Sequence, residues 1–529
     1  MSMPLAETNT DAQAALQPPA TTVPPTRPRF SEIQQLAAAV FAVGVIIASM
    51  YGPFIEREWG DDAIYDYIAQ TILRGGLPYR DVVEIKGPGS TYLSALAMAI
   101  GRTVRVSDVA SVRALHVLMI GLFSAVIFLL AVAYFNSRLL AITASLFPLL
   151  GQRLFGMCFS GTQPKLPLMI FGLLSLLFIA RNRPFLSGVC SMLACLCWQP
   201  GLMFTGVAFL IFTGYLSRWR DFAWLKVLAG AALPLAATLL YFYFRGALGD
   251  LWSWTVTFNY SVFAPQGLKP VGAALSHLSS VANRILGWKI VLLCGAAAGL
   301  LVHAFERVRA KTPGREGLNS PSIFKDAILM PPVIYLVFSI INFQAGPDLI
   351  PFYPFIAIFF AFFLHRLGQV AGRGRSINLA GRHVLADSVP LQLSCVVLLA
   401  MAVYQAFTYK IEGPTLSDQQ ATFAELSLQL SPGDQVYVHE AAEVLVLLNI
   451  PNANRYIAFD SGADDYISAG KPNGFSSVID EIESGKPKVL VLSRLNGIHY
   501  AYELVRWAEQ HYDRYPSQDY LVYIRKTSS

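Results

Sequence analysis

Two adjacent carboxylates, Asp61 and Asp62, are the first residues in the sequence whose type and spacing could do chemistry. Apolar residues recur at helical spacing over 64–73, so the pair opens a short amphipathic helix, expected at the membrane surface, that ends at glycines 75–76. A carboxylate here could act as a general base. It could also cap the helix, because an aspartate at a helix start accepts hydrogen bonds from free backbone N–H groups. Capping needs one carboxylate and keeps it ionised, which suits a base, so both interpretations stand at this point.

A cation follows in the tight turn Lys86-Gly87-Pro88-Gly89, which precedes a second surface helix predicted over 90–100. Lys86 could offset negative charge on a departing group in a partly dry site. A lysine near a membrane surface could also only contact lipid headgroups. The stretch Pro78-Tyr79-Arg80-Asp81 lies between the acidic pair and this turn. Acidic, aromatic and basic side chains therefore fall within about 25 residues of one another.

The elements that must position these residues are apolar. Of the 529 residues, 54% are hydrophobic and 14% are charged, whereas soluble domains carry roughly 25% charged residues. The mean hydropathy of +0.48 agrees with a membrane protein. A spanning helix needs about 20 apolar residues, so we predict an α-helical polytopic membrane protein with about eleven transmembrane helices. These are expected over 32–52, 112–135, 138–156, 165–180, 184–199, 201–216, 224–244, 285–304, 326–343, 349–365 and 389–409.

Basic residues fall in every second loop between the predicted spans, and this sets the orientation because Lys and Arg favour cytoplasmic loops. The tail 1–30, rich in Pro, Thr, Ala and Gln, is then a disordered cytoplasmic segment. A first loop at 53–111, a middle loop at 245–284 and the C-terminal segment 410–529 lie outside. The inside loops contain Arg138, Arg181, Arg183, Arg218, Arg220, Lys226, Arg307, Arg309, Lys311, Arg315, Lys325, Arg366, Arg373, Arg375 and Arg382. The net charge of +6 follows from such loops and does not indicate nucleic-acid binding.

The C-terminal segment 410–529 differs from the transmembrane region 31–409, because short apolar runs alternate with polar stretches. Strands are predicted at 436–438, 455–459, 488–492 and 520–524, with amphipathic helices at 473–484 and 499–511. This pattern predicts a small soluble α/β domain, on the extracytoplasmic side by the orientation above.

Together, the motifs of the first loop resemble those of the membrane glycosyltransferases of the GT-C fold. These include the protein O-mannosyltransferases, the aminoarabinose transferases of lipid A and the RgtA/B/C/D-like bacterial enzymes. Their shared pattern is an acidic pair after the first span, then a Tyr, a stretch with Pro-Tyr-x-Asp and a Lys-x-Pro-Gly turn. The matching residues are Asp61-Asp62, Tyr65, Gly76-Leu77-Pro78-Tyr79-Arg80-Asp81 and Lys86-Gly87-Pro88-Gly89. The resemblance covers residues 56–92 in sequence, and most of the chain in architecture.

The resemblance implies a reaction and a location. Such enzymes take a sugar from a polyprenyl-phosphate carrier on the outer face of the membrane and invert the anomeric configuration. The acceptor would be a lipid, a glycan or a protein, and the protein would lie in the bacterial inner membrane, surrounded by membrane lipids.

The resemblance also implies residue roles. Asp61 would take the proton of the acceptor, and Asp62 would assist by hydrogen bonding or by holding a metal. Lys86 would offset charge on the leaving phosphate. Arg80 and Asp81 would position the loop or touch the substrate. The implied substrate-binding residues are Lys86, Arg80, Asp81, Tyr65, Tyr79 and Lys165.

The sequence departs from this pattern in two places. Several relatives carry another acidic residue in the second outside loop, but residues 151–165 contain no carboxylate, which leaves the use of a divalent metal open. Lys165 and Arg153 of this loop could contact phosphate instead. Relatives also often place a basic residue before the late Pro-rich helix, where this chain has Asp348. A helix cap is favoured for Asp348 over contact with sugar hydroxyls.

Two other functions remain open at this point. A transporter or flippase of a lipid-linked glycan would place ionisable residues at mid-membrane depth and often shows inverted repeats. The predicted spans are almost free of carboxylates and show no convincing repeat, which counts against it. The missing second acidic residue leaves room for a non-catalytic family member. The sequence shows no nucleotide-sugar motif and no nucleic-acid-binding module, in agreement with a lipid-linked donor.

Overall fold

The structure is a computed structural model that describes residues 30–214, 221–263, 271–310, 326–343, 346–372, 376–379, 382–385, 388–411, 413–459, 462–517 and 519–526. The predicted cytoplasmic tail lies outside these residues, apart from its last residue. So do several basic residues of the predicted inside loops, namely Arg218, Arg220, Lys311, Arg315, Lys325, Arg373 and Arg375.

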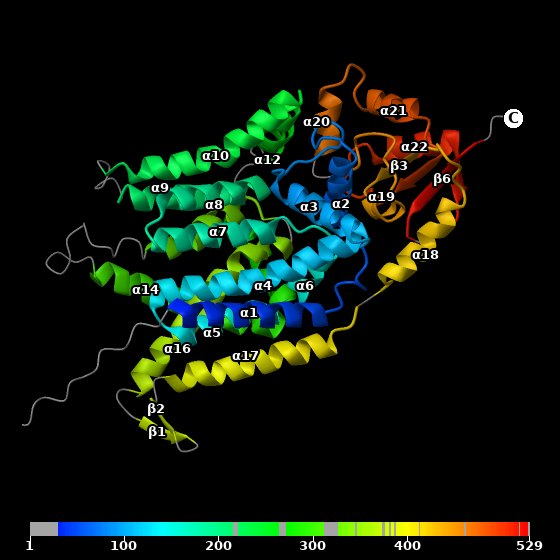
Figure 1. The fold of residues 1–529 in the computed structure, drawn as a ribbon. Helices are drawn as coiled ribbons and strands as arrows, with labels where there is room; N and C mark the ends of the chain where they lie inside the picture. The colour runs from blue at the N-terminus through cyan, green and yellow to red at the C-terminus, as the bar shows by residue number, and fades with distance from the viewer. Residues whose placement is uncertain are drawn as a thin grey trace, which may run out of the picture.

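Long apolar helices lie side by side and form a bundle, and a small sheet with short helices lies at one end of it (Figure 1). The bundle consists of α1 (Phe30–Met50), α4 (Asp108–Phe135), α5 (Arg138–Leu146), η1 (Phe147–Leu150), α6 (Gln152–Phe159), α7 (Lys165–Ala180), α8 (Pro184–Cys197), η2 (Gln199–Gly201), α9 (Leu202–Phe212), α10 (Ala223–Phe244), α14 (Ile290–Ala310), α15 (Met330–Ile341), η8 (Gly346–Phe352), α16 (Tyr353–Gly372) and α17 (Val389–Thr408).

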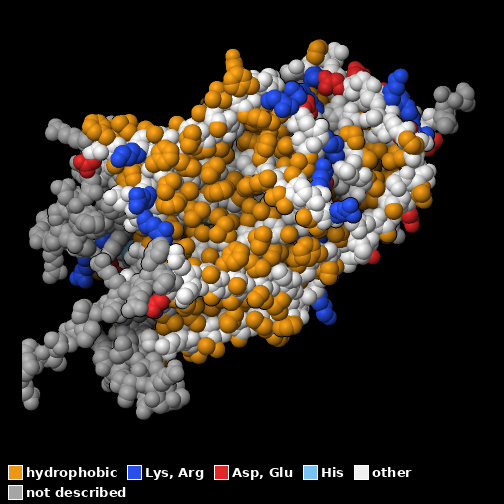
Figure 2. Space-filling view, viewed as in Figure 1, with side chains coloured by type: hydrophobic (Ala, Val, Ile, Leu, Met, Phe, Trp, Pro, Cys, Tyr) orange, Lys and Arg blue, Asp and Glu red, His pale blue; other side chains and the backbone are white. Residues whose placement is uncertain are grey.

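The helices of the bundle differ in how much of their surface the protein itself covers. The most apolar 18-residue window of α4 is 72% buried, whereas those of α10 and α17 are 22% buried. Leu233, Phe244 and Phe407 are among the large apolar side chains left exposed on these outer helices. Figure 2 shows hydrophobic side chains spread over the flank of the bundle, with charges gathered toward its ends. A flank of this composition fits lipid rather than water.

The prediction of a polytopic α-helical membrane protein with a C-terminal sheet is confirmed, but the number of eleven spans is not. Five helices of the described residues are long and apolar enough to cross a membrane, or six if a bent pair is one span. The predicted span 138–156 is this pair: it breaks at Gly151, and its two parts differ in direction by 62°. Four shorter apolar helices cover 165–180, 184–197, 199–212 and 326–341.

Further helices lie in the first loop and in the middle loop. They are α2 (Gly60–Leu73), α3 (Gly89–Thr103), α11 (Leu248–Trp252), the π-helical η4 (Ser253–Phe258), α12 (Asn259–Phe263), α13 (Val271–Leu286) and η6 (Gly287–Lys289). Both helices predicted in the first loop are present. The position of α2 at the membrane surface stays a prediction. The structure shows that α2 packs between α3 and the C-terminal segment and buries nine of its residues.

The C-terminal segment contains a four-stranded sheet. Its elements are α18 (Leu416–Ser427), β3 (Val436–His439), α19 (Ala442–Leu448), α20 (Ala463–Ala469), α21 (Phe475–Ser484), β4 (Val489–Leu492), α22 (Ala501–His511), β5 (Tyr512–Tyr515) and β6 (Leu521–Arg525). The strand order is β3-β4-β6-β5, with β3 and β4 parallel and the other neighbours antiparallel. A separate antiparallel hairpin joins β1 (Ser376–Leu379) and β2 (Arg382–Leu385).

Three of the four predicted strands and both predicted helices of this segment are present. The strand predicted at 455–459 is wrong, although its buried residues Tyr456, Ile457 and Phe459 gave it an apolar pattern. This stretch bridges two regions instead: the carbonyl of Ile457 accepts a hydrogen bond from Glu440, and that of Arg455 from Val83 of the first loop. Strand β5 was not predicted, because its residues 513–514 are exposed and show no apolar alternation.

The C-terminal segment holds the first loop through polar contacts. Gln419 of α18 exchanges two hydrogen bonds with the backbone of Glu58, of 2.8 and 2.9 Å. The Gln70 side chain donates to the carbonyl of Val446, and the Tyr67 hydroxyl accepts from Asn452. The start of α2, with its two aspartates, is therefore fixed between the bundle and the C-terminal segment.

Candidate active site

Residues from distant parts of the chain meet in one cavity of about 520 Å³ at the loop end of the bundle. Its charged lining includes Asp61 and Asp62 of α2, Lys86 of the glycine-rich turn, Lys165 of α7 and Arg494 of the C-terminal segment. We name it the acidic-pair cavity. The structure thus brings together four of the sequence-predicted residues and adds Arg494.

The two aspartates occupy the first turn of α2 rather than its N-cap. Trp59 is the N-cap and makes no side-chain capping bond. In this position the carboxylates still interact favourably with the positive end of the helix dipole. Capping by a side chain, the alternative left open by the sequence, is therefore not what the pair does.

Asp62 is half-buried and tied to the loop that precedes α7. Its carboxylate accepts hydrogen bonds from the Ser160 hydroxyl at 2.7 Å and from the Gln163 amide at 3.3 Å. Burial raises the pKa of Asp62 to about 7, while the Ser160 bond opposes the shift. Gly161 makes this approach possible, because a Cβ there would lie 2.6 Å from the carbonyl carbon of Asp62. Its φ of +142° also favours glycine.

Asp61 is the more accessible of the pair, with 60% of its side chain exposed. Its nearest charged partner is Arg494, at 3.4 Å. The Arg494 guanidinium also lies 3.6 Å from the buried Glu440 and 5.0 Å from the centre of the Trp59 ring. Sequence reasoning missed Arg494, because it lies 433 residues beyond Asp61 and no local motif surrounds it.

Lys86 is held by its own turn and by two tyrosines. The Tyr79 hydroxyl donates a 2.7 Å hydrogen bond to the Lys86 carbonyl, and the buried Glu84 carboxylate accepts the Lys86 N–H at 2.8 Å. The Lys86 ammonium donates to the Tyr65 hydroxyl and lies 4.5 Å from the centre of the Tyr65 ring. Tyr65 and Tyr79 therefore orient Lys86, and neither tyrosine is among the residues that line the acidic-pair cavity.

Gly87 and Gly89 let this turn lie directly on the end of α8. A Cβ at Gly87 would clash with the carbonyl of Leu196, and one at Gly89 would lie 3.0 Å from the same group. Only glycine permits such an approach without displacing the backbone. The Lys-Gly-Pro-Gly sequence is thus a packing requirement that sets the position of Lys86.

Lys165 is buried and paired with Asp348 at 2.8 Å. Its ammonium lies 4.7 Å from the centre of the Trp198 ring. Asp348, for which the sequence favoured a capping role, thus neutralises a cation that lines the cavity. Sequence spacing gave no sign of this pair, because the partners lie on α7 and η8.

Arg80 and Asp81 do not join the cavity. They form a two-bond ion pair with each other, of 2.8 and 2.9 Å. Arg80 also donates to the carbonyl of Arg245, and Asp81 accepts from the backbone of Leu77. The geometry favours positioning of the turn over contact with substrate, the two alternatives for these residues.

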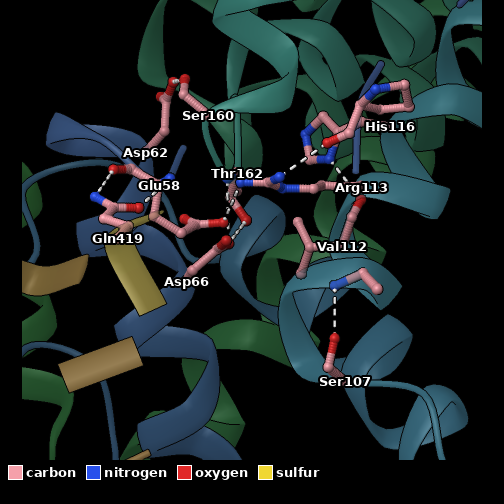
Figure 3. Close-up of polar contacts among 12 residues, drawn as sticks. Glu58, Asp62, Asp66, Ser107, Val112, Arg113, His116, Ser160, Thr162 and Gln419 are labelled. Carbon is pink, nitrogen blue, oxygen red and sulfur yellow. Dashed lines mark hydrogen bonds and ion pairs between the residues drawn. The ribbon is translucent and has the colours of Figure 1, made fainter. Parts of the chain in front are cut away.

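A buried polar network lies beneath Asp62 (Figure 3). Arg113 of α4 donates to the Glu58 carboxylate and to the carbonyl of Pro53, each at 2.9 Å. Asp66 of α2 accepts from the hydroxyl and the N–H of Thr162. Burial and the neighbouring Glu58 carboxylate hold the pKa of Asp66 well above its usual range. Of these two buried carboxyl groups, Glu58 is the one that pairs with Arg113.

The residues around the acidic pair do not fit a metal ion. No group of three or more His, Cys, Asp or Glu side chains suited to a metal occurs among the described residues. Besides Asp61 and Asp62, the charged side chains that line the cavity are the carboxylate Glu56 and the cations Arg57, Lys86, Lys165 and Arg494. A divalent cation needs several oxygen ligands, and four cations would repel it.

A recess of about 580 Å³ adjoins the acidic-pair cavity and shares Asp61, Lys86, Lys165 and Pro347 with it. One part of its wall is apolar and aromatic, and the polar side chains Gln199, Thr255, Asn259 and Asn342 line another part. The apolar part includes Trp198, Val256, Tyr260, Phe338 and Ile341. We name it the aromatic recess. Its lysines stand only at the border with the acidic-pair cavity.

Solved structures resemble this chain in fold. No protein-family model and no curated protein matches the sequence. ArnT from Cupriavidus metallidurans bound to undecaprenyl phosphate has a TM-score of 0.58 at 14% identity, covering 93% of this chain and 98% of that chain. Its apo state has a TM-score of 0.55 at 13% identity with the same coverage. The Archaeoglobus fulgidus oligosaccharyltransferase tethered with an acceptor peptide has a TM-score of 0.51 at 14% identity, covering 93% and 74%.

The contact of Gly87 with Leu196 predicts a stability difference between two glycine variants. Gly87→Ala must push the turn off α8, which we expect to lower the free energy of unfolding by about 1–3 kcal/mol. Gly206→Ala is the control, because no atom lies within 4 Å of a Cβ there. It should be neutral or stabilise by about 0.4–1 kcal/mol. Thermal unfolding of the full chain in detergent tests this, and equal effects would contradict the packing argument.

The raised pKa of Asp62 predicts a pH-dependent effect of Asp62→Asn. The folded-state pKa of about 7 exceeds the unfolded value of about 3.9, so ionised Asp62 costs stability that grows as pH rises from about 4 to about 7. Removing the carboxylate should therefore raise the unfolding temperature, relative to wild type, more at pH 8 than at pH 5. Asp513→Asn, an exposed change in β5, is the control. If the difference in unfolding temperature between Asp62→Asn and wild type does not change with pH, the raised pKa of Asp62 is refuted.

The Arg113–Glu58 pair predicts non-additive destabilisation. Arg113→Met leaves a buried carboxylate without its cation and should lower the free energy of unfolding by about 3–5 kcal/mol. The double variant Arg113→Met/Glu58→Gln should recover part of this loss. Arg506→Met, at an exposed position of α22, serves as the control. Chemical or thermal unfolding measures all four proteins, and a double variant no more stable than Arg113→Met would contradict the pairing.

Proposed function

We propose, because the chain has the GT-C fold of membrane glycosyltransferases, that it transfers a sugar from a polyprenyl-phosphate-linked donor to a lipid, glycan or protein acceptor. One observation carries the proposal: an acidic pair and two lysines line a single cavity next to an apolar recess. A lipid-phosphate donor presents an apolar chain, an anionic phosphate and a sugar, and this cavity has a complementary surface for each.

Asp61 is the general base of the proposed reaction. Its carboxylate takes the proton of the acceptor hydroxyl while that oxygen forms a bond to the anomeric carbon. The bond between the anomeric carbon and the phosphate oxygen breaks, and its electron pair leaves with the polyprenyl phosphate. Attack from the face opposite the leaving group inverts the configuration. Asp61 suits this role because it is accessible, whereas both carboxylate oxygens of Asp62 already accept hydrogen bonds.

Lys86 supplies the cation for the leaving phosphate. Lys165 is also at the border of the aromatic recess, but Asp348 already neutralises it at 2.8 Å. The Lys86 ammonium instead contacts the neutral hydroxyl and ring of Tyr65, so its charge remains available to the phosphate. A fixed cation in a partly dry site stabilises developing negative charge without reorganising.

Asp62 positions the first turn of α2. With a pKa near 7 it carries a proton for part of the time at neutral pH, and its hydrogen bonds tie α2 to the loop containing Ser160 and Gln163. This role places Asp62 within the site while Asp61 performs the proton transfer.

The topology supports an extracytoplasmic site in the bacterial inner membrane. Helix α7 begins at Lys165 beside the cavity and ends at Ala180, just before the basic residues Arg181 and Arg183. Sixteen helical residues span about 24 Å, so these arginines lie near the opposite end of the bundle. Basic loops favour the cytoplasm. The C-terminal domain, 410–529, is then extracytoplasmic together with the cavity, and region 31–409 is the transmembrane domain.

The position of the charged groups favours transfer over transport. Asp61 and Lys86 belong to short loop elements at one end of the bundle, whereas ion-coupled transporters place such residues at mid-membrane depth. A catalytic role also explains why an accessible carboxylate faces the same cavity as a lysine.

The proposal predicts the behaviour of Asp61→Asn. With a panel of polyprenyl-phosphate sugars and a membrane extract as the acceptor source, we expect this variant to lower the transfer rate by about 10²–10⁴-fold. Asp513→Asn, which removes an exposed carboxylate of β5, should transfer at the wild-type rate. If Asp61→Asn transfers sugar at the wild-type rate, Asp61 is not the general base. Loss only in Asp62→Asn, with a wild-type pH profile that rises near pH 7, would assign the base to Asp62.

A further inference from the structure

A second cavity with a volume of about 700 Å³ opens beside the acidic-pair cavity. Four basic side chains line it: Arg153 of α6, Arg284 of α13, Lys289 of η6 and Lys410 just beyond α17. We name this cavity the basic chamber. The one carboxylate in its lining is Glu56, which stands at the border with the acidic-pair cavity.

The basic chamber and the acidic-pair cavity are continuous. They share Glu56, Gly156 and Met157, so a molecule bound in the chamber can extend toward Asp61. The aromatic recess joins the acidic-pair cavity through a different set of residues, which includes Lys86 and Lys165. The acidic pair therefore stands between an apolar space and a basic one.

The four cations gather from elements that are far apart in the sequence, and like charges that converge repel one another. Among the described residues, no carboxylate forms an ion pair with any of the four. The Lys289 ammonium donates to the carbonyl of Leu150 and to the Gln405 side chain, which are neutral acceptors. The fold thus gathers four positive charges that no described carboxylate pairs with, and Glu56 is the single carboxylate among the residues that line the chamber.

The direction of the reaction assigns the chamber to one of the two substrates. An inverting displacement brings the acceptor to the face of the anomeric carbon opposite the leaving phosphate. Lys86 lies at the border of the aromatic recess, so the phosphate and its apolar chain occupy that side. The acceptor must then enter from the side of the basic chamber.

We infer that the basic chamber binds the acceptor, and that the acceptor carries a phosphate or carboxylate group near the hydroxyl that receives the sugar. The inference rests on the proposed function and narrows its acceptor to an anionic one. Arg153 and Arg284 are exposed at the chamber wall, and guanidinium groups suit two-bond contacts with either anion. The anion fixes the acceptor while its hydroxyl reaches Asp61.

Binding of anionic probes tests this inference. The full chain in neutral detergent is titrated with mixed micelles of dioleoylphosphatidic acid, and with dioleoylphosphatidylcholine as the zwitterionic comparison. We expect phosphatidic acid to bind more tightly. Arg153→Gln/Arg284→Gln should weaken its binding by about tenfold or more. Arg181→Gln/Arg183→Gln, which removes two arginines at the other end of α7, should bind like wild type. Equal weakening in the two double variants would overturn the inference, because both sets would then be general headgroup anchors.

Competition with soluble anions shows whether the chamber recognises a phosphate group, a carboxylate group or only a phosphate carried by a lipid. Displacement of phosphatidic acid by inorganic phosphate assigns recognition to the phosphate group, and displacement by glucuronate extends it to carboxylates. If neither displaces it while the arginine dependence holds, the chamber recognises a lipid-borne phosphate. Lys410→Gln provides a second chamber variant if the double variant does not fold. If Lys410→Gln binds phosphatidic acid like wild type and the arginine variants also leave binding unchanged, the inference is overturned.

The experiment contains no sugar donor, so its outcome is independent of transfer. Asp61→Asn should bind phosphatidic acid like wild type. Transfer that persists without any arginine-dependent anion binding would overturn the role of the chamber alone. Arginine-dependent binding by a protein that transfers no polyprenyl-phosphate sugar would overturn the proposed function.

Discussion

The buried ion pair between Arg113 and Glu58 is the interaction on which the arrangement of the site depends. Arg113 belongs to α4, the most enclosed of the long helices, and Glu58 precedes α2 by two residues. Charges this deeply buried must be paired, because an unpaired one would lose its hydration without compensation. The pair therefore permits one position for the start of α2 against the bundle. Gln419 makes that position a three-way junction, because its side chain bonds the backbone of Glu58.

The neighbouring carboxyl group of Asp66 extends this constraint to the loop before α7. Asp66 accepts hydrogen bonds from Thr162, and the backbone of Gln163 donates to His116 at 3.0 Å. The Gln163 side chain then reaches Asp62. Each link joins α2 or α4 to the loop at 160–163, so hydrogen bonds hold the acidic pair against the cavity wall. Preorganisation of this kind is what a site needs to hold a base at a fixed position.

Sequence reasoning predicted the parts of this site that lie close together in the chain. The acidic pair, Lys86 and the glycines of its turn form a local pattern, and the structure brings them to one cavity with Lys165. Arg494 and the Glu58–Arg113 pair could not be found in this way, because each depends on the meeting of segments separated by tens to hundreds of residues.

What the sequence could not predict about the fold has the same origin. Apolar periodicity identified α2 as a helix but could not show that the C-terminal segment covers its outer face. Length alone suggested one span at 138–156, where Gly151 separates two helices that bend away from each other. The run at 455–459 has the composition of a strand, yet its backbone groups bond to separate partners. In each case a tertiary contact overrode a local preference.

The dependence of the site on Gln419 and Arg494 has a consequence for biogenesis. Translation proceeds from the N-terminus, so the acidic pair leaves the ribosome more than 350 residues before Gln419 and more than 430 before Arg494. During that interval the helices can insert and pack, but the junction at Glu58 lacks its last partner. The nascent chain therefore passes through membrane insertion with an unfinished acidic-pair cavity, and only a fully synthesised protein acquires a complete one.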